Sequence, residues 1–458
     1  MLRELMRHQS WALDQLSSRP GLFLPPGTGK TLIAIRYIKR NKLLPALIVC
    51  RRDDFLTWRL ELELDEVSSS NICLIQSSRD MFPAWFRLWT LITYDLVRKI
   101  AHPVALADFR SIVADESYMI KHWSAKRTKA LIKATRHVPY RIAMTGTPIT
   151  NDLGDVFTQC LFMDRGELFG TSYWAFRNKY YIQSGPGWYL KRTAKRDILE
   201  KLKSIAICVD EDDVLKLPPV RRVLKSVPIS GAQKRLQNSI LQNWEYQLRQ
   251  GTDPIEVNHV VTQLTKLRQV ASGFIYDEKG GVHWMKSYKL QLLKDMLTDD
   301  DLLGTKPKLV IWCAFTAEIK KIKQLAEELS IEAVTFYGRQ NKDKARKDFQ
   351  NDKSIRLFVG QSDSGVGMNE LVVSDTAVYY SNSYRVVSRQ QSEGRIRRKG
   401  SERHQVITYW DLVTEGTVDE SMLKSLQRNI SLANFITEGL RNYQPLSQIL
   451  GVNYGTTS

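Results

Sequence analysis

The sequence contains few of the residues that form disulfides or structural metal sites. It has five cysteines and seven histidines among 458 residues. No CxxC spacing occurs, and no His/Cys cluster has the spacing of a zinc site. The cysteines are scattered, mostly in apolar runs, at Cys50, Cys73, Cys160, Cys208 and Cys313. We therefore expect reduced cysteines and a reducing, cytoplasm-like compartment.

Long hydrophobic runs are also lacking. No apolar run approaches the length of a membrane span. The first residues, MLRE, lack the apolar segment of a secretory signal. We expect no membrane partner and a cytoplasmic location.

Acidic residues are fewer than basic ones. The chain has 49 Asp and Glu against 67 Lys and Arg, which gives a net charge of +18 and a sequence pI near 9.5. Such an excess favours a polyanionic partner, and a merely soluble basic protein is the alternative. The length predicts about three domain-sized units, and an apolar content of 43% supports well-packed domains.

The stretch LPPGTGKT at 24–31, called the phosphate loop below, lies between a short apolar strand and a helix. Free N–H groups of a glycine turn and the positive end of a helix create a space that suits a polyphosphate. Lys30 can reach the terminal phosphates, and the Thr31 hydroxyl is placed to hold Mg²⁺. Pro25 and Pro26 have no N–H, so the binding segment must begin at residue 27. The predicted cradle consists of Gly27, Thr28, Gly29, Lys30 and Thr31.

An apolar strand at 111–114 ends in Asp115 and Glu116. Two adjacent carboxylates are costly to place together unless a cation lies near them. Asp115 can therefore hold Mg²⁺, while Glu116 orients and deprotonates an attacking water. A simple acidic turn is the alternative. Upstream, the amide of Gln9 can bind an adenine edge, although a solvated helix residue is the alternative for Gln9 alone.

The order of elements predicts the domain organisation. Strands at 46–50, 91–94, 111–114 and 141–144 alternate with helices, which is typical of a doubly wound parallel sheet. Aromatic residues and two amphipathic helices interrupt this rhythm, which returns from residue 287. We predict an α/β fold with two parallel-sheet lobes and a mainly helical insert. The expected units are 1–155, 156–285, 286–430 and a C-terminal tail at 431–458.

A β-hairpin is expected inside the insert. Aromatic segments at 180–182 and 188–190 flank the turn sequence SGPG, and Lys191 and Arg192 begin a basic run directly afterwards. Such a hairpin could wedge between or stack on nucleic-acid bases while the cations hold phosphates. For most of these aromatic residues, core packing is the alternative.

The second α/β lobe has no phosphate loop of its own. Its segment QSEGRIRR at 391–398 is expected to open a helix with Arg395 and Arg398 on one face. Such a pair can supply guanidinium groups to a nucleotide held by the other lobe. A basic surface that touches DNA phosphate is the alternative.

Taken together and in this order, the motifs resemble those of superfamily 2 helicases and, within them, the SNF2 group. The resemblance covers about residues 5–425. In the first half, the matching segments are the glutamine motif at 5–9, motif I at 25–31, motif Ia at 47–61, the next DNA-facing motif at 92–95, the DEAH-type box at 115–118 and motif III at 145–151. In the second half, they are motif IV at 311–313, motif V at 365–369 and motif VI at 391–398, with group markers at 217–219 and 267–269.

The resemblance implies two RecA-like lobes that bind ATP and Mg²⁺ between them and nucleic acid across their top. It implies catalytic roles for Lys30, Glu116, Arg395 and Arg398, a nucleotide contact by Gly367, and Mg²⁺ support by Asp115. Coupling or DNA contact is implied for Trp58, Thr93, Thr145, Thr147 and Asn369, and Lys191 and Arg192 join them from the basic run. Ser117 and Tyr118 depart from the usual box, which puts its coupling to motif III in doubt.

The expected function is that of a monomeric, ATP-dependent DNA translocase or helicase acting on duplex, forked or branched DNA. In size and layout the chain is similar to small phage members of the group that drive branch migration. Displacement of bound proteins without strand separation is one alternative, and a non-hydrolysing ATP-gated clamp is another. The sequence PPGTGKT of the phosphate loop also occurs in AAA-type oligomeric ATPases, but the arginine pair in the second lobe favours a monomer. Charge alone does not separate DNA from RNA.

Overall fold

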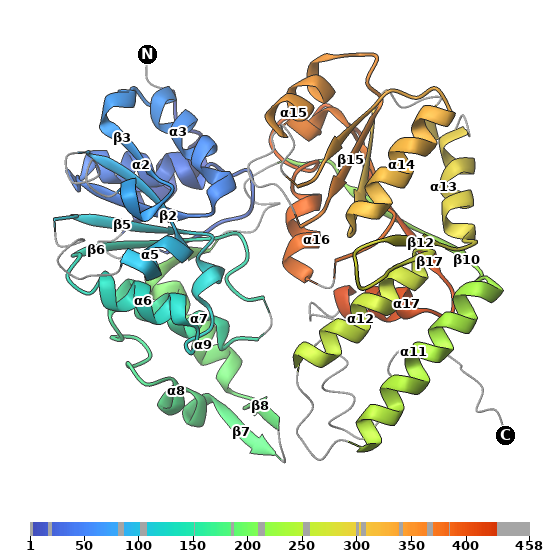
Figure 1. Ribbon diagram of the computed structural model, residues 1–458. Helices are drawn as coiled ribbons and strands as arrows, with labels where there is room; N and C mark the ends of the chain where they lie inside the picture. Colours follow the sequence, from blue (N-terminus) through green and yellow to red (C-terminus); the bar gives the residue numbers. More distant parts are fainter. Residues whose placement is uncertain are drawn as a thin grey trace. The chain divides into compact units, whose positions relative to one another are not determined.

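The computed structural model describes residues 3–16, 21–80, 87–100, 108–150, 152–184, 187–208, 216–250, 257–298, 302–303, 308–338, 342–363, 370–383 and 385–427. The chain forms two compact units, 1–216 and 217–458 (Figure 1). Each unit is described by itself.

The first unit is built on a parallel sheet of seven strands within the described residues. Every pair of neighbouring strands is parallel. Their order is β3 (Ile72–Ile75), β4 (Trp89–Thr93), β2 (Ala46–Cys50), β5 (Ser111–Asp115), β6 (Tyr140–Met144), β1 (Gly21–Phe23) and β9 (Ala206–Cys208).

Helices cover both faces of this sheet, so its central strands are buried on both sides and consist of continuous apolar runs. One apolar cluster joins one face to α1 (Arg7–Gln15), α2 (Lys30–Arg40) and α3 (Phe55–Leu64). A second cluster joins the other face to α5 (Tyr94–Ile100), α6 (Lys126–Ala134), α7 (Asp155–Asp164), α8 (Tyr173–Tyr180) and α9 (Ala194–Ile205).

The predicted β-hairpin is present in the first unit. Strands β7 (Tyr181–Ser184) and β8 (Gly187–Leu190) pair antiparallel, with Ile182 opposite Tyr189. The tip residues Gly185 and Pro186 lie outside the described residues.

The second unit contains a parallel sheet of six strands within the described residues. Their order is β10 (Val220–Val227), β17 (Ile407–Thr414), β16 (Thr376–Tyr379), β13 (Leu309–Cys313), β15 (Leu357–Gln361) and β14 (Ala333–Phe336). The helices of this unit are α11 (Gly231–Gln250), α12 (Val257–Ala271), α13 (Tyr288–Thr298), α14 (Thr316–Glu328), α15 (Lys342–Asn351), α16 (Val386–Glu393) and α17 (Val418–Gln427). A short antiparallel pair, β11 (Phe274–Tyr276) and β12 (Val282–Trp284), completes the unit.

The two parallel sheets, the hairpin and the added helices confirm the predicted fold class. The segment expected to form a separate insert, 156–285, is instead shared between the two units. Its first part ends in β9, which pairs with β1 at the edge of the first sheet. Its second part begins with β10, which pairs with β17 at the edge of the second sheet. The tail at 431–458 lies outside the described residues, and no described helix is long and apolar enough to cross a membrane.

Candidate active site

The phosphate loop connects β1 to α2 and requires glycine at two positions. Gly27 and Gly29 have φ values of +83° and +81°, which residues with a side chain rarely adopt. A Cβ at Gly29 would lie 2.1 Å from Nε2 of Gln9. Glycine at position 29 therefore serves both the left-handed turn and the close approach of α1.

Gln9 is packed against the phosphate loop and is only 4% exposed. Its Nε2 donates to the Thr28 carbonyl at 3.0 Å, and its Oε1 accepts from the Met6 N–H at 3.0 Å. Nε2 of His8 lies 2.9 Å from the same Thr28 carbonyl. The residue predicted to bind adenine thus has its amide engaged by main-chain groups and fixes the conformation of the loop.

Lys30 is the first residue of α2, and its ammonium lies back across the loop. Its Nζ donates to the carbonyls of Leu24 at 2.7 Å and Pro25 at 3.0 Å. The Thr28 hydroxyl donates to the Pro25 carbonyl at 2.8 Å. Thr31 follows in the first turn of α2, where N–H groups have no helical partner and favour an anion.

The strand order brings Asp115 and Glu116, called the acidic turn below, close to this loop. Because β5, β6 and β1 are adjacent and parallel, the segments that follow them meet at one edge of the sheet. Thr145, directly after β6, donates its hydroxyl to Oε2 of Glu116 at 3.1 Å and accepts from the Thr147 N–H at 3.0 Å. A Cβ at Gly146 would lie 3.1 Å from Cδ of Pro26. Residues 145–147 are therefore in contact with both the acidic turn and the phosphate loop.

Asp115 carries a carboxylate that its surroundings make costly. Burial and the neighbouring Glu116 raise the pKa of Asp115 to about 6, against the opposing effects of a hydrogen bond from Trp58 and the charge of Lys30. The Trp58 Nε1 donates to Oδ2 of Asp115 at 2.7 Å, and the Tyr94 hydroxyl donates to its main-chain carbonyl at 2.7 Å. A cation placed at Asp115 would offset this cost.

Trp58 was predicted to couple to or contact DNA, but its ring is 1% exposed within α3. Its observed contact is with the acidic turn, so the structure contradicts a direct DNA contact by this side chain. The apolar positions of α3 turn the ring toward the sheet, and the indole N–H then meets the end of β5.

Glu116 has a left-handed backbone with φ of +51°. This conformation is strained for a non-glycine residue, and such strain concentrates at functional sites. Its N–H donates to Oδ1 of Asp115 at 3.0 Å. The next residue, Ser117, is buried and donates to Oε1 of Gln159 on α7 at 2.6 Å. The unusual serine of the box therefore connects the acidic turn to α7.

Sequence reasoning missed two residues, Arg51 and Asp54, beside the acidic turn. Arg51 follows β2, its Nε lies 3.5 Å from Oδ2 of the buried Asp54, and its Nη1 lies 3.5 Å from the Tyr118 hydroxyl. Burial raises the pKa of Asp54 well above its usual range, although Arg51 opposes the shift. Their position after a central parallel strand is the only signal that the sequence offered.

Other predicted DNA contacts lie apart from the phosphate loop. Thr93 ends β4, and its hydroxyl accepts from the Leu96 N–H at 3.3 Å, where α5 begins. The Lys191 ammonium donates to the carbonyls of Asn178 and Lys179 at the end of α8, and Arg192 is exposed beside it. The predicted sites Gly367 and Asn369 lie outside the described residues, as does Asn151 of the motif III extension.

The prediction that Arg395 and Arg398 share one face of a helix is wrong. Helix α16 begins at Val386 and ends at Glu393, and Gly394 is its C-terminal cap. Glu393 is held by Arg222 at 2.5 and 2.7 Å and by Arg389 at 2.5 Å, so the helix ends in an ion-pair cluster.

Both arginines lie beyond α16 in the second unit. Arg395 is buried, with its guanidinium carbon 5.3 Å from the centre of the Trp312 ring. The main-chain N–H of Arg398 donates to the Ser401 hydroxyl at 3.2 Å. Their action on a nucleotide held by the first unit stays a prediction.

The residues at the phosphate loop fit ATP with Mg²⁺. The left-handed glycines leave N–H groups without side chains above them, and a hydroxyl, an ammonium and two carboxylates surround the same edge of the sheet. Among the described residues, no group of three or more His, Cys, Asp or Glu side chains could hold a metal alone. Mg²⁺ in phosphate-loop sites needs no such group, because phosphate oxygens and waters complete its shell.

Comparisons with known proteins agree with this chemistry. The sequence profile of the SNF2-related domain matches residues 11–273, more than half of the chain. YwqA of Bacillus subtilis (strain 168), whose name describes a candidate ATP-dependent helicase/translocase, is 23% identical over 440 residues, which cover 90% of this chain and 46% of YwqA. Protein p41 of Acyrthosiphon pisum secondary endosymbiont phage 1 is 25% identical over 354 residues, which cover 73% of each protein. This chain thus spans under half the length of YwqA.

Among solved structures, the Sulfolobus solfataricus SWI2/SNF2 ATPase core in complex with dsDNA is 22% identical and has a TM-score of 0.44. The match covers 100% of this chain and 98% of that chain.

Replacement of Gly29 by alanine tests the phosphate loop. We expect Gly29→Ala to weaken ATP binding more than about tenfold. The new Cβ must displace Gln9, and alanine must adopt a strained positive φ at this position. Gly280→Ala is the matched control, since Gly280 has φ of +83° but no atom within 4 Å of the position that the new methyl group would occupy. Calorimetric titration with ATP measures both variants. Native affinity in Gly29→Ala would show that the close packing of α1 on the loop is not needed.

The raised pKa of Asp115 predicts a pH dependence. Mg²⁺ binding needs the ionised carboxylate, so kcat/KM for ATP should fall as pH drops through about 6. Trp58→Phe removes the N–H that stabilises the carboxylate and should move this midpoint to higher pH. Trp89→Phe, in the same apolar cluster, should leave the midpoint in place. The same midpoint in the native chain and both variants would show that ionisation of Asp115 does not set the pH profile.

Proposed function

This chain belongs to the SNF2-related domain family, and we propose from this premise that it is an ATP-driven motor that moves on DNA. Family membership implies ATP hydrolysis that depends on DNA. The single observation that supports the proposal most is the hydrogen bond between Thr145 and Glu116 beside the phosphate loop. It joins a candidate base to a segment that also touches the loop, as a motor needs if nucleotide state is to change the conformation of its lobe.

The proposed roles follow the geometry of the loop. Lys30 leaves the carbonyls of Leu24 and Pro25 and binds the terminal phosphates, and the N–H groups from Gly27 onward hold the remaining oxygens. Thr31 and Asp115 would hold Mg²⁺, which would neutralise charge on the phosphates when bound. Glu116 accepts a proton from the attacking water, while Thr145 orients the carboxylate. Arg395 and Arg398 contribute positive charge in the transition state.

The proposed substrate is DNA that is forked or branched. The net charge of +18 supports a polyanion, and YwqA is named for helicase or translocase activity. The hairpin supports strand separation, because Ile182 and Tyr189 form a cross-strand pair on one face and are 56% and 46% exposed. Arg192 lies exposed just beyond β8 and could hold a phosphate. We propose that the chain drives branch migration, as small phage helicases do. We further propose that it acts as a monomer in the cytoplasm. Its similarity to the phage protein p41 supports the first of these proposals.

ATP hydrolysis with different DNAs tests the substrate. The full chain is assayed alone, with single-stranded, duplex, forked and four-way DNA, and with single-stranded and duplex RNA, with Lys30→Ala as the blank. We expect the greatest stimulation with forked or four-way DNA. Stimulation by plain duplex alone would favour a translocase that displaces proteins, and stimulation by RNA alone would overturn the choice of DNA.

Replacement of the candidate base separates binding from turnover. Glu116→Gln should bind ATP and DNA almost as the native chain does, yet lose at least about a thousandfold in kcat, because an amide cannot accept the proton. Glu66→Gln is the control, because Glu66 is also a glutamate with a left-handed backbone, at φ of +61°. Retained turnover in Glu116→Gln would remove Glu116 from the base role.

Truncation of the hairpin face tests the wedge. The double variant Ile182→Ala and Tyr189→Ala should keep DNA-stimulated ATP hydrolysis within about twofold but slow strand displacement on a fork at least about fivefold, since the exposed pair no longer enters between bases. Val282→Ala, on the exposed face of β12, controls for loss of surface apolar area. Equal loss of hydrolysis and strand displacement would count against a wedge.

A further inference from the structure

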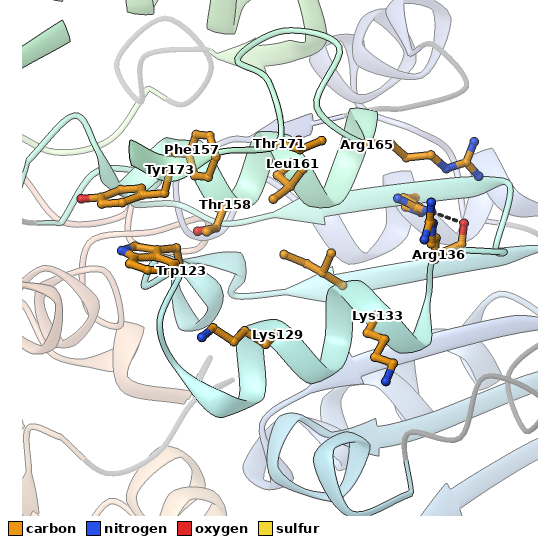
Figure 2. Close-up of a pocket in the computed structure, with 12 residues that line it drawn as sticks. Trp123, Lys129, Lys133, Arg136, Phe157, Thr158, Leu161, Arg165, Thr171 and Tyr173 are labelled. Atoms are coloured by element: carbon orange, nitrogen blue, oxygen red, sulfur yellow. Dashed lines mark hydrogen bonds between the residues drawn. The ribbon is translucent and has the colours of Figure 1, made fainter. Parts of the chain in front are cut away.

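A cavity of about 540 Å³ lies between α6 and α7 of the first unit, and no sequence motif pointed to it (Figure 2). Its size falls within the range of small-ligand sites. Twelve residues line it, and they include five cationic side chains and no carboxylate. Three of the cations gather at one end of the cavity, and the aromatic rings gather at the other end with Lys129.

One end is cationic. Lys133 and Arg136 come from α6 and the turn after it, and Arg165 caps α7, where its Nη2 donates to the Val138 carbonyl at 3.1 Å. All three side chains are exposed, and Figure 2 shows them grouped at one end. Neither Lys133 nor Arg136 has an acidic side chain within ion-pair distance among the described residues. Their charge is thus open to an anionic ligand.

The other end is aromatic. The rings of Trp123 and Tyr173 stack with their centres 5.2 Å apart and their planes at 19°. Phe157 packs edge-on against Tyr173 at 5.5 Å. Lys129 lies 5.3 Å from the centre of the Trp123 ring, and Figure 2 shows Trp123 and Tyr173 together at the end away from Arg165. This end is thus a stacked aromatic pair with one cation over the Trp123 ring.

The cavity is distinct from the phosphate loop. Arg136 precedes β6, and its carbonyl accepts from Arg141 at the start of that strand, whereas Thr145 follows the end of the same strand. The length of β6 therefore separates the cationic end from the phosphate-loop edge of the sheet, which is about 13 Å at roughly 3.3 Å per residue. A phosphate at the cationic end would therefore lie away from Lys30 and Glu116.

We propose that the α6–α7 cavity binds a nucleotide unit, with its base against Trp123 and Tyr173 and its phosphate at Lys133, Arg136 and Arg165. Base stacking on aromatic rings is tolerant of base identity, and clustered Lys and Arg bind phosphate. Lys133 lies one turn of α6 beyond Lys129, about 6 Å along the helix. Because Lys129 lies over the Trp123 ring, Lys133 is thus within about the length of one nucleotide of that ring. The same chemistry is presented by a free nucleotide and by a nucleotide within a DNA strand.

Photocrosslinking in the full-length Lys30→Ala chain identifies the ligand and its position without contribution from ATP turnover. One probe is 8-azido-dAMP, and the other is a twelve-nucleotide single strand that carries 5-iododeoxyuridine. After digestion with trypsin, we expect adducts at Trp123 in peptide 122–126 or at Tyr173 in peptide 166–177. An adduct from the oligonucleotide alone supports a DNA strand, and one from dAMP alone supports a free nucleotide. No adduct at either residue with either probe overturns the proposal.

Charge variants test the cationic end by binding of the same probes at several salt concentrations. Lys133→Ala and Arg136→Ala should each weaken binding about threefold to tenfold and lower the salt dependence of log Kd by about 0.7 for the single strand. Lys126→Ala is the matched control, since Lys126 is an exposed lysine on α6 that does not line the cavity. Equal losses in Lys126→Ala and Lys133→Ala would mean that only net charge matters and would overturn the site. The outcome is independent of the proposed motor, because binding is measured without hydrolysis.

Discussion

The adjacency of β5, β6 and β1 is the constraint on which the candidate active site depends. In a parallel sheet the carboxyl ends of neighbouring strands meet at one edge, so three turns that are far apart in sequence come into contact there. The phosphate loop, the acidic turn and residues 145–147 share this edge, and the hydrogen bond from Thr145 to Glu116 joins two of them. Helices on both faces keep the strands fixed, and the site therefore has a rigid base.

Electrostatic cost is concentrated at the same edge. Asp115 and Asp54 both have raised pKa values because of burial, and Glu116 adds its charge beside Asp115. Trp58 and Lys30 offset part of that cost for Asp115, and Arg51 does so for Asp54. The strained backbone of Glu116 adds a conformational cost. A bound cation would offset the electrostatic part of this cost. The buried carboxylates therefore connect the energetics of the fold with the proposed binding of Mg²⁺ and ATP.

Several elements were predictable because their signals are local. Apolar runs between turns identified β2, β4, β5 and β6 of the first sheet, and the SGPG turn between aromatic segments identified the hairpin. Gly27 and Gly29 identified the phosphate loop, since few other residues tolerate its left-handed backbone. The errors concern contacts over long sequence distances. Arg395 and Arg398 were expected on a helix that in fact ends at Glu393, and the burial of Trp58 depends on how α3 packs on the sheet.

The sequence alone determined the fold class, the phosphate loop and the acidic pair, because each depends on residue type and spacing within a short segment. Tertiary structure alone decided that Gln9 closes on Gly29, that Trp58 donates to Asp115, and that Arg136, Arg165 and Trp123 line one cavity. It also decided that residues 156–285 are divided between the two units, since β9 and β10 join different sheets. These features arise from packing between elements distant in the chain, for which local periodicity carries no information.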